Sequence, residues 1–432
     1  MKEFENQTIN TVSRRLLPFL MLLYLVAYID RSNISVAALQ MNAELGLTAM
    51  MYGFGAGLFY LTYIIFEVPS NIILDRVGAR RWIARIMVSW GIVACGMAFI
   101  QNASQLYVMR LLLGAAEAGF TPGVIYYISR WFPASHRARA MSRFYIAATL
   151  ASVIGLPLSG ALLKMDGIGG FSGWRWLYFI EGIPAILLGL VVLRYLPDRP
   201  SEARWLDPAQ SRWLEEVITA EKVNAPDSHA AGWHRAFSDS RVWGLSLFWL
   251  LQAFGTIGIT VFLPQILKGL SSASNFVVTL FSALPFIFAS LLMYLNGQHS
   301  DQRRERQLHL AIPMLLAGIL LLVSLRSGSL SLTYVLLILT IGLNWAATPI
   351  FWGATTEYLA GSPAAASSIA LINSIANLAG VFLPPLIGLM RDRSGSYNGG
   401  LMMVSVALFA GGLLALYLVR AQKDETPRRD LE

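Results

Sequence analysis

Four ionisable residues lie in segments of the sequence that are otherwise apolar. Asp30 and Arg31 are adjacent in the first long apolar stretch, and Arg110 and Glu117 lie seven residues apart in the fourth. A charge in membrane hydrocarbon costs several kcal/mol, so it persists only where it faces a polar interior or a partner. Arginine holds a carboxylate in a bidentate fork, and a buried acid can gain or lose a proton. These four residues therefore suit anion binding and proton exchange.

The spacing of these residues limits how they can act together. On a helix, Arg110 and Glu117 lie two turns apart on one face, with Gly114 between them leaving room. They either perform chemistry or form a structural ion pair that orients helices. Asp30 and Arg31 point about 100° apart, so we expect Arg31 to face a central cavity and Asp30 a neighbouring helix or the cavity wall. Alternatively, the first span ends earlier and leaves both residues at the outer interface.

The composition indicates that these residues are carried by a membrane protein. Of 432 residues, 56% are hydrophobic and only 13% are charged, whereas a soluble domain is about a quarter charged. The apolar residues fall in runs of about twenty, which is the length that crosses roughly 30 Å of hydrocarbon. We predict an all-α membrane protein whose twelve transmembrane helices lie near residues 16–36, 52–74, 82–101, 105–129, 140–165, 175–196, 241–268, 275–297, 307–326, 331–357, 366–390 and 399–420.

The distribution of basic residues predicts the orientation of the chain. Most of the 33 Lys and Arg residues fall in the connections that lie inside when the N-terminus is inside. This positive-inside bias predicts that both termini are cytoplasmic. The same bias accounts for the pI near 9.6, so we expect no nucleic-acid partner. The polar N-terminus with the long run after it is expected to be a first span and not a cleaved signal peptide.

Cysteine and histidine usage argues against metal or disulfide chemistry. The single cysteine, Cys95, excludes an internal disulfide framework and a multi-cysteine metal site. The five histidines show no spacing typical of metal ligands. We therefore expect no metal and no cofactor.

A polar segment divides the spans into six and six. We expect an N-terminal bundle at 1–196, a cytoplasmic linker at 197–240, and a C-terminal bundle with a tail at 241–432. Apolar residues of the linker recur at helical spacing, which predicts an amphipathic helix on the inner membrane face or, equally, a solvated linker helix. These residues are Trp205, Leu206, Trp213, Leu214 and Val217.

One connection is echoed in the two halves. NIILDRVGARRW joins the second and third spans, and NGQHSDQRRERQ joins the eighth and ninth. Both place an aspartate, Asp75 or Asp301, just ahead of clustered arginines. A duplicated six-helix unit related by a pseudo-twofold axis is common among secondary transporters, and we expect it here.

The first of these loops resembles the signature loop of the major facilitator superfamily. Further stretches resemble one branch of it, the anion:cation symporters, which include bacterial carriers of tartrate, sugar acids, phthalate and hydroxyphenylacetate. The matching stretches are Asp30-Arg31-Ser32-Asn33-Ile34, Glu67-Val68-Pro69-Ser70-Asn71, the run from Arg110 to Gly123, Gly173-Trp174-Arg175-Trp176 with Glu181-Gly182, and Leu196-Pro197-Asp198-Arg199-Pro200. The similarity covers nearly the whole chain and is strongest in the first half.

The resemblance implies roles for the membrane charges. Similar symporters use the equivalents of Arg110 and Glu117 in coupling, of Asp30 as a second protonatable site, and of Arg31 to hold the substrate carboxylate. The loop residues would lock the two halves in one state and release them in the other, although a purely topogenic role is the alternative. These gating candidates are Asp75, Arg76, Arg80 and Arg81.

Other polar and aromatic residues are candidate substrate contacts. Tyr63 matches the position of a substrate-binding tyrosine in similar symporters, with packing as the rival interpretation. Asn373 and Asn377 lie one turn apart in an apolar span and suit hydroxyl or carboxylate recognition or, equally, interhelical hydrogen bonds. The weaker candidates are Trp352, Thr355 and Gln252, followed by Glu67, Glu181 and Glu357 near helix ends. We expect Glu181 to pair with Arg175, and Pro384-Pro385 to kink or break its span.

Taken together, these features predict a proton-coupled symporter that imports a small organic anion across a bacterial inner membrane by alternating access. The expected substrate is a carboxylate such as tartrate, a sugar acid or hydroxyphenylacetate, and the expected oligomeric state is a monomer. The alternatives are an exporter of drugs or metabolites with the same fold and a sodium-coupled carboxylate symporter. We expect no enzyme or sensor, because the sequence shows no nucleophile–base pair, phosphate loop or long soluble output domain.

Overall fold

The protein is helical throughout its described part. A computed structural model describes residues 2–223, 229–359, 362 and 364–424, and every regular element in these ranges is a helix. Twelve helical segments there are long and apolar enough to cross a membrane. The predicted fold class and number of spans are therefore confirmed. The chain divides into two compact units, 1–46 with 58–226 and 47–57 with 227–432. Because these units are defined by packing, the predicted boundaries at 196 and 240 stay a prediction.

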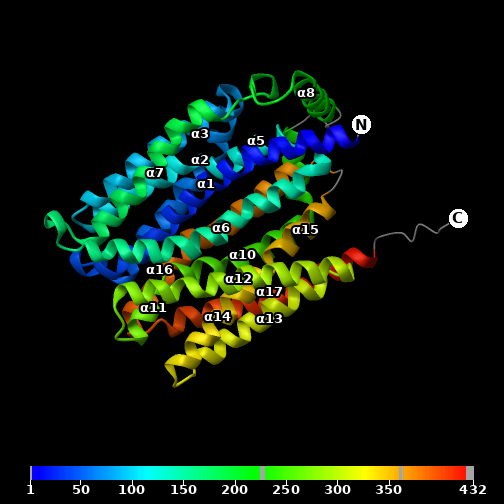
Figure 1. Cartoon of the computed structure of the whole chain (residues 1–432). Helices are drawn as coiled ribbons and strands as arrows, with labels where there is room; N and C mark the ends of the chain where they lie inside the picture. Colours follow the sequence, from blue (N-terminus) through cyan, green and yellow to red (C-terminus); the bar gives the residue numbers. More distant parts are fainter. Residues whose placement is uncertain (1, 224–228, 360–361, 363, 425–432) are drawn as a thin grey trace. The chain divides into compact units, whose positions relative to one another are not determined.

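The first unit contains most of the chain up to the green helix α8, drawn from blue through cyan in Figure 1. Two pairs of helices make its most extensive contacts, α3 with α7 and α1 with α6. Large apolar side chains such as Ile92, Ile146 and Leu187 stay exposed, as expected for faces that meet lipid. The helices are α1 (Lys2–Glu44), α2 (Ala49–Val77, whose start belongs to the second unit), α3 (Ala79–Gly96), α4 (Ala103–Glu117), α5 (Phe120–Ser129), α6 (Ala134–Leu162), α7 (Gly173–Tyr195) and α8 (Pro208–Val223).

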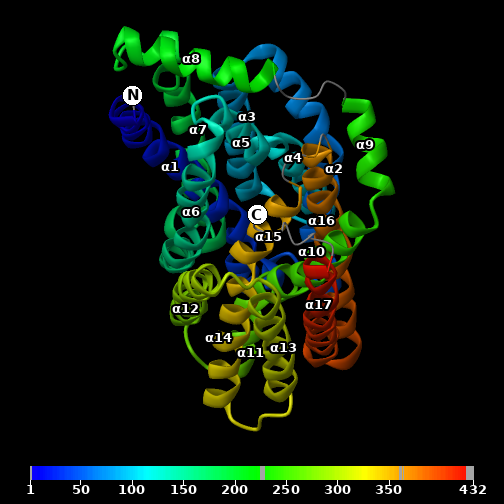
Figure 2. The same cartoon turned by 90° about the vertical axis from the view of Figure 1, so that its right-hand side faces the viewer.

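The second unit repeats the packing of the first. Its most extensive contacts join α13 to α17 and α10 to α16, and these are again the third with the sixth span and the first with the fifth. Figure 2 shows α13 beside α17. This repetition supports duplication of a six-helix unit. The helices are α9 (His229–Ser238), α10 (Ser240–Thr260), α11 (Leu263–Leu270), α12 (Asn275–Arg303), α13 (Gln307–Ser324), α14 (Leu330–Ala346), α15 (Thr348–Tyr358), α16 (Ala365–Ser394) and α17 (Asn398–Asp424).

The fourth span, predicted over 105–129, is present at Ala103–Ser129 and is divided into two helices. Helix α4 ends at Glu117, and Gly119 adopts the left-handed conformation with φ 86° before α5 begins. A Cβ at position 119 would overlap the hydroxyl of Ser70, so both the backbone and the space require glycine. The break leaves Glu117 at the C-terminal end of a helix, where the helix dipole is negative. A carboxylate there needs a compensating cation.

The tenth span, predicted over 331–357, is present at Leu330–Tyr358 and is likewise divided, at Ala347, although the backbone of Ala347 keeps helical angles. Helix α14 ends at Ala346 and α15 begins at Thr348, with proline in its first turn. Proline is tolerated there because its missing N–H has no partner in a first helical turn. Breaks in the fourth span of both halves are further support for duplication.

The linker helix packs against protein. Helix α8 buries Leu214 and Ile218, and the Trp205 ring just before it stacks on Trp131 at 5.7 Å between centroids. The predicted amphipathic helix therefore exists, but its apolar face covers the first unit. It is neither a plainly solvated linker nor a helix whose apolar residues are left free for lipid. Residues 224–228 of the predicted linker lie outside the described residues.

The double proline of the eleventh span does not break it, because α16 continues from Ala365 to Ser394. The carbonyl of Pro384 lies where a side chain at Gly53 would stand. The start of α2 thus packs closely against α16 at this proline. Membrane helices tolerate proline because neighbouring groups can satisfy the freed backbone.

Gly114 brings α2 and α4 together beside the charged residues. A Cβ at this position would overlap the carbonyl oxygen of Phe59 and the hydroxyl of Thr62. Thr62 also donates to the Leu111 carbonyl at 2.8 Å, which ties the two helices. Gly114 therefore permits a close approach, where the sequence indicated only free room.

We expect Gly114→Ala to destabilise the protein by about 1–3 kcal/mol, because the added methyl overpacks a rigid contact. Thermal unfolding in detergent measures the effect. Gly297→Ala on α12 is the matched control, since its Cβ would meet nothing within 4 Å and alanine favours the helix. Equal melting temperatures for both variants would contradict the close approach.

Candidate functional site

Arg31 and Glu117 form an ion pair inside the first unit. Arg31 Nε lies 2.5 Å from Glu117 Oε1, and the Arg31 side chain is 22% exposed whereas that of Glu117 is fully buried. Helix α1 continues past this position to Glu44, so Arg31 lies within the helix that carries the first span. Arg31 thus supplies the cation that Glu117 needs at the end of α4. The position of Glu117 beside α1, 86 residues away in sequence, was not predicted from its spacing to Arg110.

The ion pair leaves polar atoms unsatisfied. Arg31 Nη2 and Glu117 Oε2 are both buried, and neither has a hydrogen-bond partner among the described residues. The contact is therefore monodentate, although guanidinium and carboxylate can form two parallel bonds. Arg31 retains a donor for a second anion, and Glu117 retains an oxygen that a proton could occupy.

Aromatic rings surround the two arginines. Arg31 Cζ lies 4.9 Å from the Tyr63 ring centroid and 5.6 Å from that of Tyr28. The Phe59 ring contacts both cations, with its centroid 5.8 Å from Arg31 Cζ and 4.8 Å from Arg110 Cζ. Such cation–π contacts hold a guanidinium without neutralising its charge. Tyr63, a predicted contact, belongs to this cage, whereas Tyr28 and Phe59 were missed because aromatic residues are common throughout the chain.

Asp30 has a hydrogen-bond partner different from that of Arg31. It is only 1% exposed, and Asn33 Nδ2 donates to its Oδ1 at 3.0 Å. Arg110 and Arg31 are close enough for their charges to act on it. Asn33 was not singled out from the sequence, although its place one turn after Asp30 is the signal that could have found it.

Glu181 does not pair with Arg175, which corrects that prediction. Ser159 donates to Glu181 Oε1 at 2.6 Å, deep between α6 and α7. Arg175 instead lies 2.9 Å from the Glu44 carboxylate, and it donates to the Ala98 carbonyl at 2.6 Å. The two residues are six positions apart on α7, so they point to different sides of the helix.

In the second unit, Gln252 bridges the break in the tenth span. Its Nε2 donates to the Asn344 carbonyl and to the Thr348 hydroxyl, each at 2.8 Å. The carbonyl lies in the last turn of α14, where intrahelical partners are lacking. These bonds give Gln252 a structural role. Its Oε1 is buried without a partner among the described residues.

The other second-unit candidates lie around an aromatic cluster. Trp249 Nε1 donates to Asn373 Oδ1 at 3.3 Å, and the Trp249 ring stacks on Phe351 and meets Trp352 edge-on. Asn377, one turn along α16, is half-buried. Thr355 is fully buried, and its hydroxyl lacks a partner within the described part of the chain. Trp249 and Phe351 are the residues of this cluster that sequence reasoning missed.

Two of the predicted gating residues, Asp75 and Arg80, have partners within the first unit. The backbone N–H of Arg80 donates to Asp198 at 2.8 Å, and its side chain lies 3.6 Å from the same carboxylate. Tyr126 donates to Asp75 and accepts from Arg130 at 3.1 Å. Arg76 and Arg81 are exposed. The loop after α2 is thus joined to α5 and to the segment after α7.

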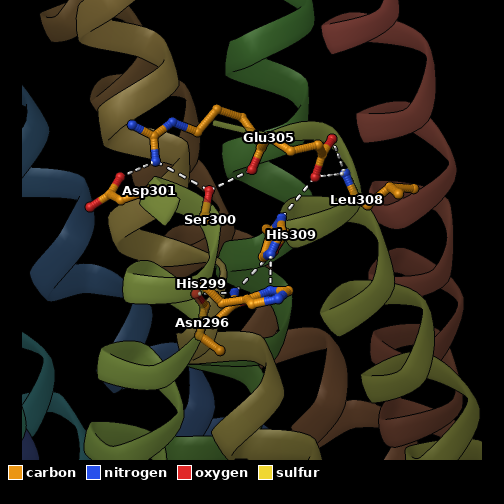
Figure 3. Close-up of polar contacts among 9 residues, drawn as sticks. Asn296, His299, Ser300, Asp301, Glu305, Leu308 and His309 are labelled. Carbon is orange, nitrogen blue, oxygen red and sulfur yellow. Dashed lines mark hydrogen bonds and ion pairs between the residues drawn. The ribbon is translucent and has the colours of Figure 1, made fainter. Parts of the chain in front are cut away.

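The echoed loop of the second unit holds a histidine pair, drawn in Figure 3. His299 Nδ1 lies 2.7 Å from His309 Nε2, and His309 Nδ1 lies 2.7 Å from Glu305 Oε2. Since a carboxylate only accepts, His309 donates through Nδ1. Arg306 pairs with Asp301 and, at 2.9 Å, with Glu357. Glu357, a weak candidate for transport, therefore ties α15 to this loop.

Glu305 stabilises the start of α13. Its carboxylate accepts the N–H of Leu308 at 2.8 Å. Partial burial favours a higher pKa for Glu305, but the hydrogen bonds from Leu308 and His309 outweigh it and lower the pKa from 4.5. Because the folded pKa is depressed, the stabilisation is present above pH 4.5 and is lost as pH falls through the folded pKa.

We expect Glu305→Gln to destabilise the protein by about 1 kcal/mol at neutral pH, the usual size of a helix-cap contribution. The difference from the wild type should shrink on acidification below pH 4.5. Thermal unfolding in detergent across pH checks both statements. Glu216→Gln on the exposed face of α8 serves as the control, and a pH-independent difference would contradict the assignment.

The family of the chain follows from comparison with known proteins. Residues 20–384 match the model of the Major Facilitator Superfamily. The chain belongs to this superfamily. Its fold agrees, since a bacterial homolog of the human lysosomal transporter Spinster superposes with a TM-score of 0.79 at 18% identity, covering 96% of this chain and 99% of the other.

Relatives of this superfamily member carry two kinds of name. A protein of Agrobacterium vitis named "Putative tartrate transporter" is 43% identical over 427 residues, covering 97% of this chain and 93% of its own length. A protein of Acinetobacter baumannii named "Quinolone resistance transporter" is 37% identical over 420 residues, covering 97% and 96%. The chain is therefore a multi-pass membrane transporter of the superfamily, and its predicted membership is confirmed.

Proposed function

We propose that this transporter is a proton-coupled symporter that imports a small organic carboxylate by alternating access across a bacterial inner membrane, with both termini cytoplasmic. The observation that carries the proposal is the monodentate, buried ion pair of Arg31 and Glu117. The relative named for tartrate supports the substrate class.

The ion pair offers a physical route to coupling. A substrate carboxylate that docks on Arg31 competes with Glu117 for the guanidinium. Leaving Glu117 buried as an unpaired anion would cost several kcal/mol, so it takes up a proton when the substrate displaces it. Substrate and proton then each raise the affinity for the other, which is a favourable coupling free energy between two sites. Asp30 supplies a second acid, and Arg110 adds positive charge for the anion.

Neutralisation also has a benefit for import. Moving one charge against the membrane potential costs about 2.3 kcal/mol per 100 mV. An anion that travels with protons avoids this penalty in a cell with a negative interior. The second-unit candidates Asn373, Asn377, Trp352 and Thr355 are proposed to contact the remainder of the substrate. Asp75, Arg76, Arg80 and Arg81 are proposed to control the change of state.

An exporter of lipophilic drugs is the second candidate function. The relative named for quinolone resistance favours it, as does the aromatic cluster of Trp249, Phe351 and Trp352. Quinolones themselves carry a carboxylate, so the arginines do not separate the two functions by chemistry alone. The direction of transport and the identity of the driving ion separate the two functions.

Uptake into proteoliposomes tests the proposal. The purified protein is given imposed pH, sodium or voltage gradients with a panel of tartrate, aldonates, hydroxyphenylacetate and a quinolone. We expect accumulation of one carboxylate that follows the proton gradient. Accumulation driven by a sodium gradient would show that sodium is the coupling ion and not the proton. Quinolone extrusion in exchange for protons would support the exporter. Uptake of no anion, or uptake indifferent to pH, would overturn the proposal.

A further inference from the structure

A third buried acid lies next to Asp30, outside the coupling scheme above. Glu181 on α7 is 5% exposed, and Ser159 on α6, which donates to its Oε1, is fully buried. Glu181 Oε2 is buried and has no hydrogen-bond partner in the described part of the chain. A carboxyl group in this position costs free energy unless it is paired or carries a proton.

Asn33 connects Glu181 to Asp30. The amide Nδ2 donates to Asp30 Oδ1 at 3.0 Å, and the same side chain interacts with the Glu181 carboxyl. Three oxygens around this amide are buried without a donor among the described residues, namely Asp30 Oδ2, Asn33 Oδ1 and Glu181 Oε2. Carboxylates and amide oxygens only accept. A proton on one carboxyl would convert an acceptor into the donor that the cluster lacks.

The charges around the cluster are unequal. Asp30 is under the influence of Arg110 and Arg31. The groups acting on Glu181 within the described residues include Ser159, Asp30, Asn33 and Tyr178, and none of these four is a cation.

The remaining titratable neighbours do not supply a positive charge either. Tyr178 of α7 is close enough to Asp30, Glu181 and Arg110 for their charges to act on it, and its hydroxyl is buried without a partner in the described ranges. Cys95 of α3 is close enough to Asp30 to interact with its charge, and Glu117 of α4 adds a like charge to Asp30. Asp30 and Glu181 share one amide, and Glu181 has no neighbouring cation among the residues that the structure describes. Ionising both carboxyl groups in this buried position is therefore costly in free energy.

We propose that Asp30 and Glu181 form a carboxyl pair, joined through Asn33, that holds one proton, and that Glu181 thereby positions the proton that Asp30 exchanges during transport. The proposal rests on the proposed proton-coupled function. It assigns to α7 a part in coupling that the ion pair of α1 and α4 does not contain. Glu181 acts through Asp30 and is a positioning residue, since no substrate contact is invoked.

The charge state of the pair is measured without transport. Infrared spectroscopy of the purified wild type in liposomes at neutral pH should show absorption from a protonated carboxyl group. Glu181→Gln keeps the shape of the side chain and should remove that absorption or weaken it. Glu216→Gln, an exposed carboxyl on α8, should leave it unchanged. An unchanged absorption in Glu181→Gln would overturn the shared proton.

The pH profile of uptake then tests the coupling role. In Glu181→Gln, Asp30 loses its negative neighbour and its partner for the proton. The pH midpoint of the protonation step that drives uptake should therefore move to lower pH, by about one unit. Asn33→Ala keeps both acids but removes the donor that stabilises the Asp30 anion. Its profile should move to higher pH, so the two variants shift in opposite directions, which a general loss of packing does not produce.

The outcomes separate this inference from the proposed function. If wild-type uptake is indifferent to the proton gradient, the proposed function fails. The infrared result alone then decides whether Asp30 and Glu181 share a proton. If wild-type uptake is proton-driven but both variants keep the wild-type profile, the coupling role of Glu181 is overturned and the function stands. If Glu181→Gln does not fold, Asn33→Ala and its upward shift carry the test, and an unshifted profile there overturns the inference.

Discussion

Glu117→Gln should abolish proton-driven accumulation while substrate exchange continues. The glutamine keeps a polar contact with Arg31 in a fully buried position, but it cannot bind and release a proton. The transporter would then bind substrate and change state without a coupled proton. Each pH unit across the membrane supports up to about tenfold accumulation per coupled proton. The ratio of internal to external substrate should therefore fall to about one in the variant.

Two assays in the same proteoliposomes separate coupling from folding. Counterflow of labelled against unlabelled substrate should persist in Glu117→Gln, which shows that the protein is folded and cycling. Glu117→Asp retains a titratable group with a shorter reach and should recover part of the accumulation. Normal accumulation by Glu117→Gln would mean that Glu117 has a purely structural role.

Replacing Arg31 by alanine should remove carboxylate binding. Arg31 is the partly exposed member of the ion pair, and its Nη2 lacks a partner among the described residues. Truncating one partner of a desolvated charge pair costs about 2–5 kcal/mol, so we expect the dissociation constant to rise by at least about thirtyfold. Equilibrium binding of the labelled carboxylate identified in the uptake panel measures the change.

The design must allow for Glu117, which Arg31→Ala leaves buried without its cation. The double variant Arg31→Ala with Glu117→Gln removes both charges and should restore folding without restoring binding. Arg31→Lys keeps the charge but lacks the planar fork, so it should give an intermediate affinity. Arg212→Ala on the exposed face of α8 is the control. Unchanged affinity in Arg31→Ala would move the anion site elsewhere.

Several contacts within the site could not be predicted from the sequence. Spacing along one helix places Arg110 and Glu117 on a common face, but the ion partner of Glu117 is Arg31 on another helix. The partner depends on how α1 and α4 are rotated and on the close approach at Gly114. That Asp30 and Arg31 have different partners agrees with their angular separation, which depends only on the turn of a single helix.

The pairing of Glu181 shows the same limit. Proximity in sequence favoured Arg175, yet Glu181 lies against Ser159 and Arg175 against Glu44. Likewise, the breaks in the fourth and tenth spans lie inside continuous apolar runs, so hydropathy does not reveal them. They depend on a left-handed glycine in one case and an early proline in the other.

The sequence by itself determined the class of protein, the number of spans and the superfamily. Burial of an apolar segment in lipid is a local and nearly additive property, so a run of twenty residues reveals a span without knowledge of its neighbours. The tertiary structure decided which charges meet, that the apolar face of α8 covers protein, and that Asp30, Asn33 and Glu181 form one cluster. Those outcomes depend on contacts between helices distant in sequence, and no local pattern encodes their rotation or separation.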